Sequence, residues 1–446
     1  MLLFLLCIAC VFCFVMHRLL VFDYVDNEAA ATTAATPLLH YYYSDNNNKR
    51  RRHHHNNNNN SKSLFTIIQF ADLHFGGDRS KDEHTKQVMR NVLRAEEEGG
   101  ASVDLVVFSG DQISGWLIDE PSIKARKRMH LLDDALGVVR SAGIPYAVLW
   151  GNHDDQPYHF DTGVWFTWTL RTSFLIAIVI FLVLLYIFSY GQKNKNGNAF
   201  LFLGILMVLL MTAFYMVVLT KPSKNARNIM QAHDEFKKKG HNLNIGSSWI
   251  THGVGGNFYY HVPILNHSLL LIFLDSGGGR IPERIYDEQV VWVESIQDAF
   301  PQAISLVFLH IPLPEYTTIS GGGEKLRCFG GDGSGRGGET PSSVNYEHKS
   351  LYEGLGRKGK TKAIFVGHDH ANSWCCLPPL IIGRKKTIMP ALCYGKHTGY
   401  GGYDDDTPAI RGARVIRVNV SSLSLLHITT WLRMEDATLQ GSSVLF

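Results

Sequence analysis

Short apolar runs rich in β-branched and aromatic residues recur along the chain, and each of the clearest ones stops at a polar residue. Runs of this length and composition are typical of buried β-strands. The clearest occupy residues 65–70, 105–109, 146–150, 306–309 and 363–366. Amphipathic stretches with helical spacing, at 81–98 and 123–141, separate the first three. The pattern therefore predicts strand–helix–strand alternation and an α/β fold.

The second half of the chain continues with more strands and one further amphipathic helix. Strands are predicted at 257–265 and 268–274, and the helix at 286–300 leads into the fourth apolar run. Short strands follow near the end of the chain, at 387–392, 413–420 and 425–431. These last strands predict that the chain closes in a second sheet.

Two much longer apolar stretches interrupt this pattern before the fourth run. Residues 173–190 and 199–219 contain no charged residue and are joined by a polar turn at 191–198. A helix needs about 20 apolar residues to cross a bilayer. We therefore predict a transmembrane helical hairpin inserted at 161–222. The alternative is a buried helical hairpin within a soluble domain.

The N-terminal part of the chain also departs from a globular pattern. Residues 1–22 are largely apolar, which indicates either a signal anchor or a signal peptide. Residues 23–62 carry runs of asparagine, arginine and histidine, and we predict that they form a low-complexity linker. The folded domain is then expected over residues 63–446, interrupted by the hairpin.

Composition and charge add few constraints. A hydrophobic content of 45% and a charged content of 19% are ordinary for a globular protein. The net charge of +3 is too small to indicate a nucleic-acid partner. The cysteines of the folded part are Cys328, Cys375, Cys376 and Cys393. Their number and spacing predict neither a disulfide framework nor a zinc site, so the redox compartment is left open.

Polar residues with metal-binding side chains follow the five clearest strand runs. Because ligands of layered α/β proteins collect beyond the carboxyl ends of the strands, we expect these side chains at one rim. They are Asp72, His74, Asp111, Asn152, His310, His368 and His370. Mixed nitrogen and oxygen donors without thiolates suit Mn, Fe or Zn. The sequence therefore predicts a site for two divalent metal ions.

Asp111 of this set, and the two residues that follow Asn152, have more specific expectations. Asp111 follows Gly110, which lets the backbone come close to the ions, and its two carboxylate oxygens make it the predicted bridge. His153 is predicted to protonate the leaving group, and Asp154 to orient His153 through its second ring nitrogen. Two ions about 3.5–4 Å apart can activate water for an in-line displacement at phosphorus.

The ordered motifs resemble the calcineurin-like metallophosphoesterase superfamily, whose pattern is Asp-x-His, Gly-Asp, Gly-Asn-His-Asp/Glu, His and Gly-His-x-His. Residues 70–76, 310–316, 367–372 and 394–403 are similar to the purple acid phosphatase-like branch, a group that is similar to the membrane-anchored phosphatase of yeast. The resemblance covers residues 64–432 apart from the hydrophobic insert. It implies a four-layer αββα sandwich of two mixed sheets.

The resemblance also implies how the ligands divide. One ion is expected on Asp72, His74, Asp111 and His370, and the other on Asp111, Asn152, His310 and His368, with His153 as the acid. One departure matters. Ser114 occupies the position of the tyrosine that binds ferric iron in purple acid phosphatases, and those enzymes lack a histidine at the position of His74. A colourless Mn, Fe(II) or Zn site is therefore expected.

These features together predict a membrane-attached phosphomonoesterase acting on a phosphorylated protein or small molecule. The alternatives are a phosphodiesterase of the same fold and a catalytically silent membrane scaffold. The side of the membrane is left open. Basic residues flanking the predicted hairpin favour a cytosolic domain, whereas the Asn-x-Ser sequons at Asn59, Asn266 and Asn419 fit a lumenal or extracellular one.

Overall fold

The computed structural model describes residues 63–114, 125–154, 257–278, 282–320, 327–330, 339–377, 389–402, 410–420 and 426–446. The predicted N-terminal segment 1–22, the linker 23–62 and the hairpin at 161–222 lie outside these ranges, so their placement stays a prediction. Among the helices of the described ranges, none has both the length and the apolar character needed to cross a membrane.

The first sheet joins strands from both ends of the described chain. Its strand order is β15-β14-β13-β1-β2-β3. The strands are β1 (Leu64–Phe70), β2 (Leu105–Ser109), β3 (Tyr146–Leu149), β13 (Gly412–Val420), β14 (Leu426–Met434) and β15 (Leu439–Val444). The first three run parallel, and β13 pairs antiparallel with β1. The prediction that the C-terminal strands form a second sheet is therefore wrong for β13 and β14, because they complete the first sheet.

The second sheet is built from the middle of the chain, in the order β4-β5-β7-β10-β12-β11-β8. Its strands are β4 (Phe258–Ile264), β5 (His267–Phe273), β7 (Ile304–Phe308), β8 (Arg327–Phe329), β10 (Thr361–Val366), β11 (Cys375–Leu377) and β12 (Ala391–Tyr394). The central strands β5, β7, β10 and β12 are parallel. A short pair, β6 (Arg284–Ile285) and β9 (Asn345–Tyr346), stands apart. The predicted α/β fold with two large mixed sheets is thus confirmed.

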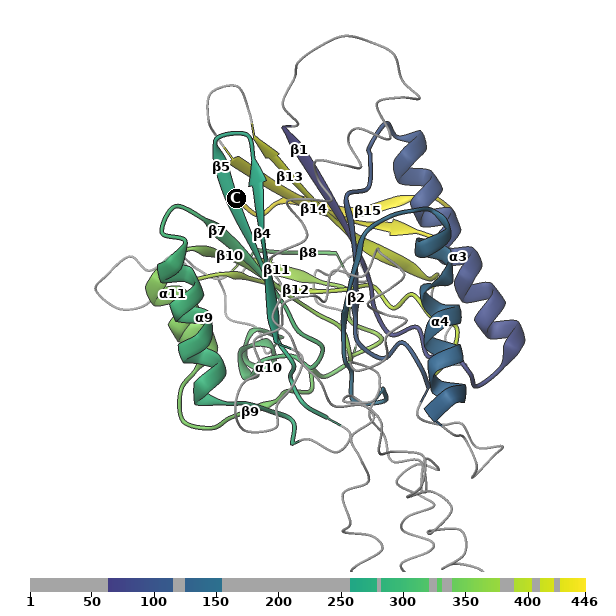
Figure 1. Ribbon diagram of the computed structural model, residues 1–446, viewed down its shortest axis with the longest axis horizontal. Coiled ribbons are helices and arrows are strands. Elements are labelled where there is room, and N and C mark those ends of the chain that lie inside the picture. The colour runs from purple at the N-terminus through teal and green to yellow at the C-terminus, as the bar shows by residue number, and fades with distance from the viewer. Residues whose placement is uncertain are drawn as a thin grey trace, which may run out of the picture.

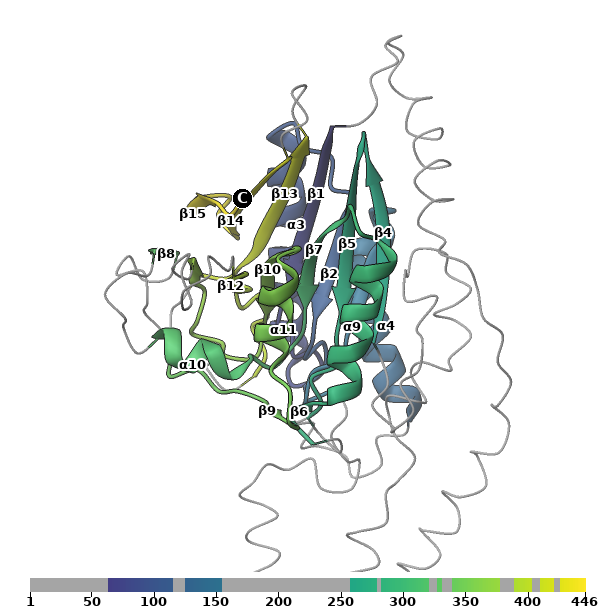
Figure 2. The same cartoon turned by 90° about the vertical axis from the view of Figure 1, so that its left-hand side faces the viewer.

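Helices cover the outer faces of the two sheets (Figures 1 and 2). The first sheet carries α3 (Arg79–Glu98) and α4 (Ala125–Ser141), and the second carries α9 (Asp287–Ala299) and α11 (Leu351–Lys358), with α10 (Pro314–Ser320) near its lower end in Figure 1. Strand alternation explains the layers. Phe65 and Ile67 of β1 belong to the apolar cluster between the sheets, whereas Ile68 packs on the α3 and α4 side.

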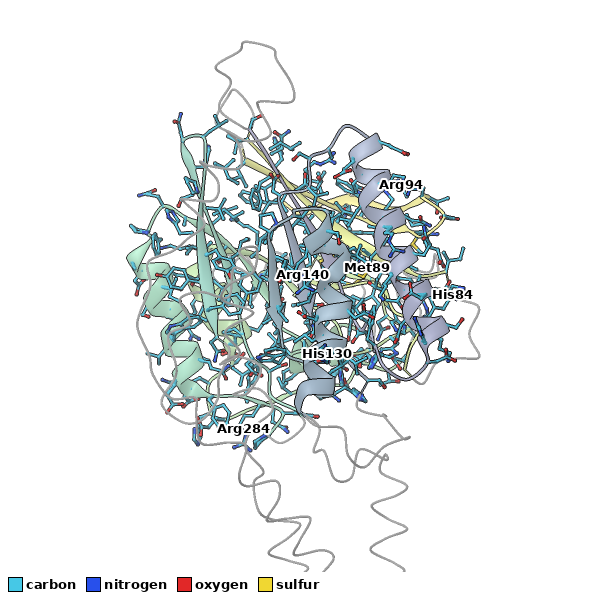
Figure 3. All side chains as sticks on the ribbon, turned by 45° about the vertical axis from the view of Figure 1, so that its right-hand side comes forward. His84, Met89, Arg94, His130, Arg140 and Arg284 are labelled. Carbon is cyan, nitrogen blue, oxygen red and sulfur yellow. A yellow bond between two sulfur atoms is a disulfide. The ribbon has the colours of Figure 1, made fainter. Side chains whose placement is uncertain are left out.

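Helix α3 shows how a polar sequence is held against the first sheet. The Asp78 side chain accepts hydrogen bonds from the backbone N–H of Ser80 and Lys81, which caps the first turn. Met89 is fully buried, whereas His84 and Arg94 on the same helix are exposed (Figure 3). This division into a buried and an exposed face is what the helical spacing predicts.

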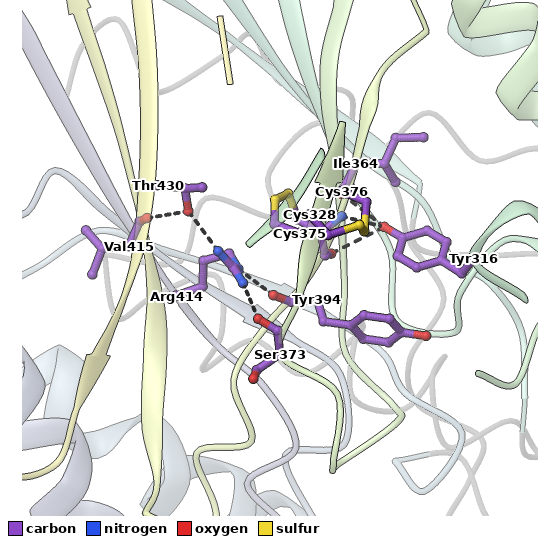
Figure 4. Close-up of a disulfide and its surroundings, with 11 residues drawn as sticks. Tyr316, Cys328, Ile364, Ser373, Cys375, Cys376, Tyr394, Arg414, Val415 and Thr430 are labelled. Carbon is purple, nitrogen blue, oxygen red and sulfur yellow. Dashed lines mark hydrogen bonds between the residues drawn. A yellow bond between two sulfur atoms is a disulfide. The ribbon is translucent and has the colours of Figure 1, made fainter. Parts of the chain in front are cut away.

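Two disulfides lie in the second sheet, next to its outer edge. They join Cys328 to Cys376 and Cys375 to Cys393, and each pair has a Cα–Cα distance of 4.0 Å (Figure 4). In both pairs the two residues lie directly opposite each other on neighbouring strands. The expectation of no disulfide framework is therefore wrong, because the pairing depends on strand register, which cysteine spacing does not reveal.

Candidate metal centre

The first group of donors lies beyond the ends of β1 and β10. The Nε2 atom of His74 is 3.0 Å from Nε2 of His370, and His370 Nε2 is 3.9 Å from Asp72 Oδ1. All three side chains are buried. One donor atom from each residue lies within 4.8 Å of the others, a spacing that one metal ion could fill.

The second group lies beyond β2, β3, β7 and β10. The Nε2 atom of His310 is 3.3 Å from Asp111 Oδ2 and 3.3 Å from His368 Nδ1. The Asn152 side-chain oxygen is 3.1 Å from His310 Nε2 and 3.0 Å from His368 Nδ1. These four residues, like the first group, converge on a small volume. All seven predicted ligand residues are therefore brought to one rim.

Asp111 lies between the two groups. Its Oδ1 accepts a hydrogen bond of 2.8 Å from the backbone N–H of His153. That contact fixes the carboxylate so that Oδ2 lies 3.3 Å from His310 Nε2 and 3.8 Å from His74 Nε2. A single oxygen thus faces both donor groups, which is the geometry that a bridging ligand requires.

The backbone at the strand ends explains how residues two apart can reach one point. Asp72, His74, Asp111 and His368 have φ angles of 57°, 51°, 53° and 74°, in the left-handed region that non-glycine residues rarely adopt. On a regular strand, Asp72 and His74 would point to the same face about 7 Å apart, and the left-handed backbone replaces that regular spacing with a tight turn. Strained backbone of this kind clusters at functional sites, where the surrounding structure holds it in place.

Two glycines make the close approach possible. A Cβ atom at Gly110 would overlap the imidazole ring of His310, and one at Gly151 would overlap the Asp111 carboxylate. Gly110 also has a φ of 104°, which disfavours any side chain there. The Gly-Asp and Gly-Asn-His-Asp motifs therefore owe their glycines to the packing of the centre.

Hydrogen bonds from outside the donor groups orient the ligands. His310 Nδ1 lies 2.9 Å from the backbone oxygen of Ser109, so this nitrogen carries a proton and the Nε2 atom is turned toward Asp111 and Asn152. The backbone N–H of His368 donates to Asp72 Oδ1 at 3.0 Å. Contacts of this kind fix ring orientation in metal sites.

Electrostatics in the buried centre favour the ligand forms of His74, His368 and Asp111, whereas the facing Asp111 outweighs burial and raises the pKa of His310 to about 9, and burial raises the pKa of Asp72 to about 6. Burial, with the neighbouring His370, holds the pKa of His74 well below its usual value, and burial with His310 lowers the pKa of His368 to about 3. Burial opposes ionisation of Asp111, but the facing His310 and His153 outweigh it and hold the Asp111 pKa well below its usual value. Neutral imidazoles and an ionised carboxylate are the forms that bind metal.

The donor set fits divalent transition metals. Imidazole nitrogens from His74 and His370 face each other at 3.0 Å, and with a neutral His74 ring at least one lone pair is directed into the gap. Imidazole, carboxylate and amide donors without thiolates suit Mn, Fe or Zn. Among the described residues, another group of potential donors, Asp287, Glu347 and His348, is partly exposed and is held together by hydrogen bonds at the start of α9.

His153 lies beside the donors. Its Nε2 is 3.9 Å from Asp111 Oδ2, and its ring packs edge-on against His74 with centroids 4.9 Å apart. Asp154 is fully buried; its Oδ1 accepts from the Ile113 N–H at 3.1 Å and its Oδ2 from the Gly151 N–H at 2.9 Å. These bonds brace the turn that carries Asn152 and His153. The predicted role of Asp154 in orienting the His153 ring stays a prediction.

The hydroxyls of the two tyrosines near the centre form hydrogen bonds with carboxylates outside the donor groups. The Tyr394 hydroxyl donates to Asp369 Oδ2 at 2.6 Å, and the Tyr400 hydroxyl lies 2.8 Å from Glu435 Oε2. Ser114, at the position that a ferric-binding tyrosine would occupy, is buried and its N–H donates to the Phe75 carbonyl. The geometry therefore offers no described tyrosine hydroxyl to the donor groups.

Sequence reasoning assigned no role to His397, which packs against the centre. Its ring centroid is 3.9 Å from that of His370, and its Nδ1 accepts from Arg411 Nη1 at 2.9 Å. It lies in segment 394–403, which the sequence singled out only by resemblance. The glycines, histidine and tyrosines of that segment were the one feature of the sequence that could have indicated His397 as a site residue.

Comparison with known proteins agrees with these features. The calcineurin-like phosphoesterase family matches residues 65–216. Phosphatase DCR2 of Saccharomyces cerevisiae is 26% identical over 403 residues, a match that covers 84% of this chain but 54% of the yeast protein. The chain thus spans about half the length of that relative.

A plant relative is similar over most of both chains. It is named probable inactive purple acid phosphatase 29 of Arabidopsis thaliana, is 24% identical over 408 residues, and the match covers 83% of this chain and 82% of the plant protein. Among solved structures, purple acid phosphatase PPD1 from yellow lupin seeds has a TM-score of 0.40 at 11% identity, covering 86% of this chain and 54% of the lupin protein. Residues 65–216 therefore match the calcineurin-like phosphoesterase family, and most of the chain is similar to the yeast phosphatase and to purple acid phosphatase-like proteins.

Proposed function

We propose that the chain is a metal-dependent phosphoesterase that hydrolyses phosphomonoesters by two-metal activation of water. The observation that carries this proposal is the position of Asp111, whose Oδ2 faces His74 of one donor group and His310 of the other. A carboxylate held between two clusters of imidazole and oxygen donors is suited to two cations close together.

The predicted ligands would form two metal-binding sets that share Asp111. Asp72, His74, Asp111 and His370 would hold one ion, and Asp111, Asn152, His310 and His368 the other. When bound, two such ions lower the pKa of a coordinated water and neutralise charge on the phosphoryl oxygens. The fixed backbone at the strand ends would keep the donors in place without rearrangement during the reaction.

His153 is proposed as the proton donor to the leaving group. Its Nε2 lies at the edge of the donor groups rather than inside one of them. A positioned imidazole can hold a proton at Nε2 until the ester oxygen leaves, and then supply it. Asp154 supports this role through the turn, by fixing the Gly151 and Ile113 backbone.

A catalytically silent scaffold is the second candidate, because a similar plant protein is named probable inactive. Against it stands the donor set, since each predicted ligand of this chain is present and directed to one rim. The yeast relative is named a phosphatase, which supports monoester hydrolysis. The substrate is proposed to be a phosphorylated protein or a phosphorylated small molecule.

Attachment to a membrane is also proposed, on the sequence of residues 173–190 and 199–219. The full chain should stay with membranes after alkaline carbonate extraction and be released by detergent. Release into the carbonate supernatant would contradict membrane insertion and favour the buried hairpin.

The activity is tested with purified full chain in detergent. Hydrolysis of p-nitrophenyl phosphate should greatly exceed that of bis(p-nitrophenyl) phosphate, and a chelator should abolish it reversibly. Preference for the bis ester would identify a phosphodiesterase. Absence of turnover with metal bound would identify the scaffold.

A further inference from the structure

The two disulfides fasten one short strand to both of its neighbours. Cys375 and Cys376 are adjacent on β11, and their side chains point to opposite faces of the sheet, one into the cluster between the sheets and one toward the α9 and α11 side. Cys375 bonds to Cys393 on β12, and Cys376 bonds to Cys328 on β8. All cysteines in the described part of the chain are therefore paired.

Such pairing indicates the compartment in which the domain folds. Disulfides form and persist in oxidising compartments and are rare where cytosolic reductants keep thiols reduced. Each bond forms when two thiols lose two protons and two electrons to the thiol-oxidising machinery of that compartment. Cys375, Cys376 and Cys393 are fully buried, which shields the finished bonds from exchange.

A sequon lies on the surface of the same sheet. Asn266 and Leu265 form the turn between β4 and β5, where Ile264 pairs with His267. Both turn residues are exposed. Ser268, two residues after Asn266, completes the sequon Asn266-His267-Ser268. Its hydroxyl lies in β5 beside the His261 ring. An asparagine at an exposed two-residue turn can carry a bulky substituent without disturbing the ladder.

From these independent observations, the disulfides and the exposed sequon, we propose that the catalytic domain faces the secretory lumen or the cell exterior and that Asn266 carries an N-linked glycan. In the transfer, Asn266 Nδ2 forms a bond to the anomeric carbon of a lipid-diphosphate-linked oligosaccharide. The lipid diphosphate leaves and one amide proton is lost.

The position of the turn leaves the metal centre open. Asn266 precedes β5, which runs parallel to β7, and His310 follows the far end of β7. At about 3.3 Å per residue, the seven residues of β5 place the turn roughly 20 Å from that end. The β4–β5 turn lies at the upper end of β4 and β5 in Figure 1, and the rim lies beyond the other end of β5.

The test uses the full chain expressed in eukaryotic cells, with Asn59→Gln and Asn419→Gln so that a gel shift reports Asn266 alone. Peptide N-glycosidase should increase its mobility and convert Asn266 to aspartate in the tryptic peptide. Ser268→Ala should abolish the shift, whereas Ser268→Thr, which keeps the hydroxyl, should preserve it.

A second readout tests the compartment without the glycan. Cells are lysed in an alkylating reagent, and the peptides are mapped before reduction. Cys328–Cys376 and Cys375–Cys393 should be recovered as linked peptides. An unmodified Asn266 peptide, or alkylated thiols at these cysteines, would overturn the proposal. Neither readout depends on phosphatase activity, so the proposed function is tested separately.

Discussion

At the scale of single residues, the proposed chemistry separates residues that hold metal from residues that act beside it. His153 belongs to the second kind, since its Nε2 is 3.9 Å from the Asp111 carboxylate while its backbone N–H fixes that carboxylate. Replacing its side chain removes the ring but keeps the backbone contact. The two contributions of this residue can therefore be separated by mutation.

His153→Ala should keep its metal content while turnover of phenyl phosphate falls by about 10²–10⁴-fold. The loss should be smaller for p-nitrophenyl phosphate, because a good leaving group needs no protonation. Steady-state rates for both esters, with metal analysis of the same samples, provide the measurement. An equal loss for the two esters would rule out the acid role.

His397 acts through another residue, because its ring packs on His370. His397→Asn should weaken metal binding by about 10-fold, as changes to groups supporting metal ligands do. Affinity is measured by chelator competition, and the melting temperature of the metal-loaded protein should hardly change. His130→Ala, an exposed histidine on α4, is the matched control. Unchanged affinity in His397→Asn would leave this residue a packing role only.

The colour of the protein reports on its tyrosines. Since the Tyr394 and Tyr400 hydroxyls contact Asp369 and Glu435, the purified protein should be colourless. After chelation, activity should return best with Mn, Fe(II) or Zn, and poorly with Mg or Ca, which prefer oxygen donors. An intense visible absorption band would show that a tyrosinate reaches the metal and that this residue assignment fails.

At the scale of elements, α3 is tied to the first sheet by a buried acid. Glu96 accepts from the Trp431 indole N–H at 3.0 Å and from Arg433 Nε at 2.7 Å, and it lies 3.4 Å from Arg417 Nη2. Its side chain is 2% exposed. Both arginines are on the antiparallel strands β13 and β14, so this one residue links the helix to the C-terminal half of the sheet.

Glu96→Ala should lower the free energy of unfolding by about 2–3 kcal/mol, less than the ~3–5 kcal/mol for a fully buried pair because both arginines are partly exposed. Urea unfolding of the metal-loaded protein measures the change. The neighbouring Glu97→Ala, at an exposed position of α3, should change it by less than about 0.5 kcal/mol. Similar values for both variants would contradict the link.

Element patterns could be predicted where they depend on local spacing. The apolar runs at β1, β2, β3, β7 and β10, and the helical spacing of α3 and α9, all appear in the structure. The sheet that accepts β13 could not be predicted, since its pairing with β1 joins residues more than 300 positions apart. The disulfides were missed for the same reason: they follow from the register of β8, β11 and β12.

The candidate site was more predictable than the sheet order. Asp72, Asp111 and His368 could be predicted as site residues because each follows the end of an apolar run. The ends of parallel strands lie at the same rim of a sheet. His397 follows β12 without a metal-ligand motif, so only its packing on His370 reveals it. Similarly, the left-handed backbone at Asp72 and His74 could not be predicted from the apolar run before it, because it departs from regular strand geometry.

At the scale of the whole molecule, the centre joins the two sheets. Asp72, His74 and Asp111 come from the end of the first sheet, and His310 and His370 from the second. The His310 ring reaches across to the Ser109 carbonyl, and the His368 backbone reaches across to Asp72. The two layers also meet through apolar contacts and through hydrogen bonds from Gln69 to the Val366 carbonyl and from Arg414 to the Ser373 carbonyl. Metal bound at the centre would add a further connection, so occupancy should raise the stability of the whole domain.

The central claim is that Asp111 bridges two metal ions that are required for turnover. Its most direct test is the metal-to-protein ratio of the purified full chain and its Asp111→Asn variant, measured by elemental analysis on samples also assayed with p-nitrophenyl phosphate. Bridging by Asp111 predicts two divalent ions per wild-type chain, and loss of metal together with loss of activity in the variant. A variant with a full metal complement and near-normal turnover would contradict it.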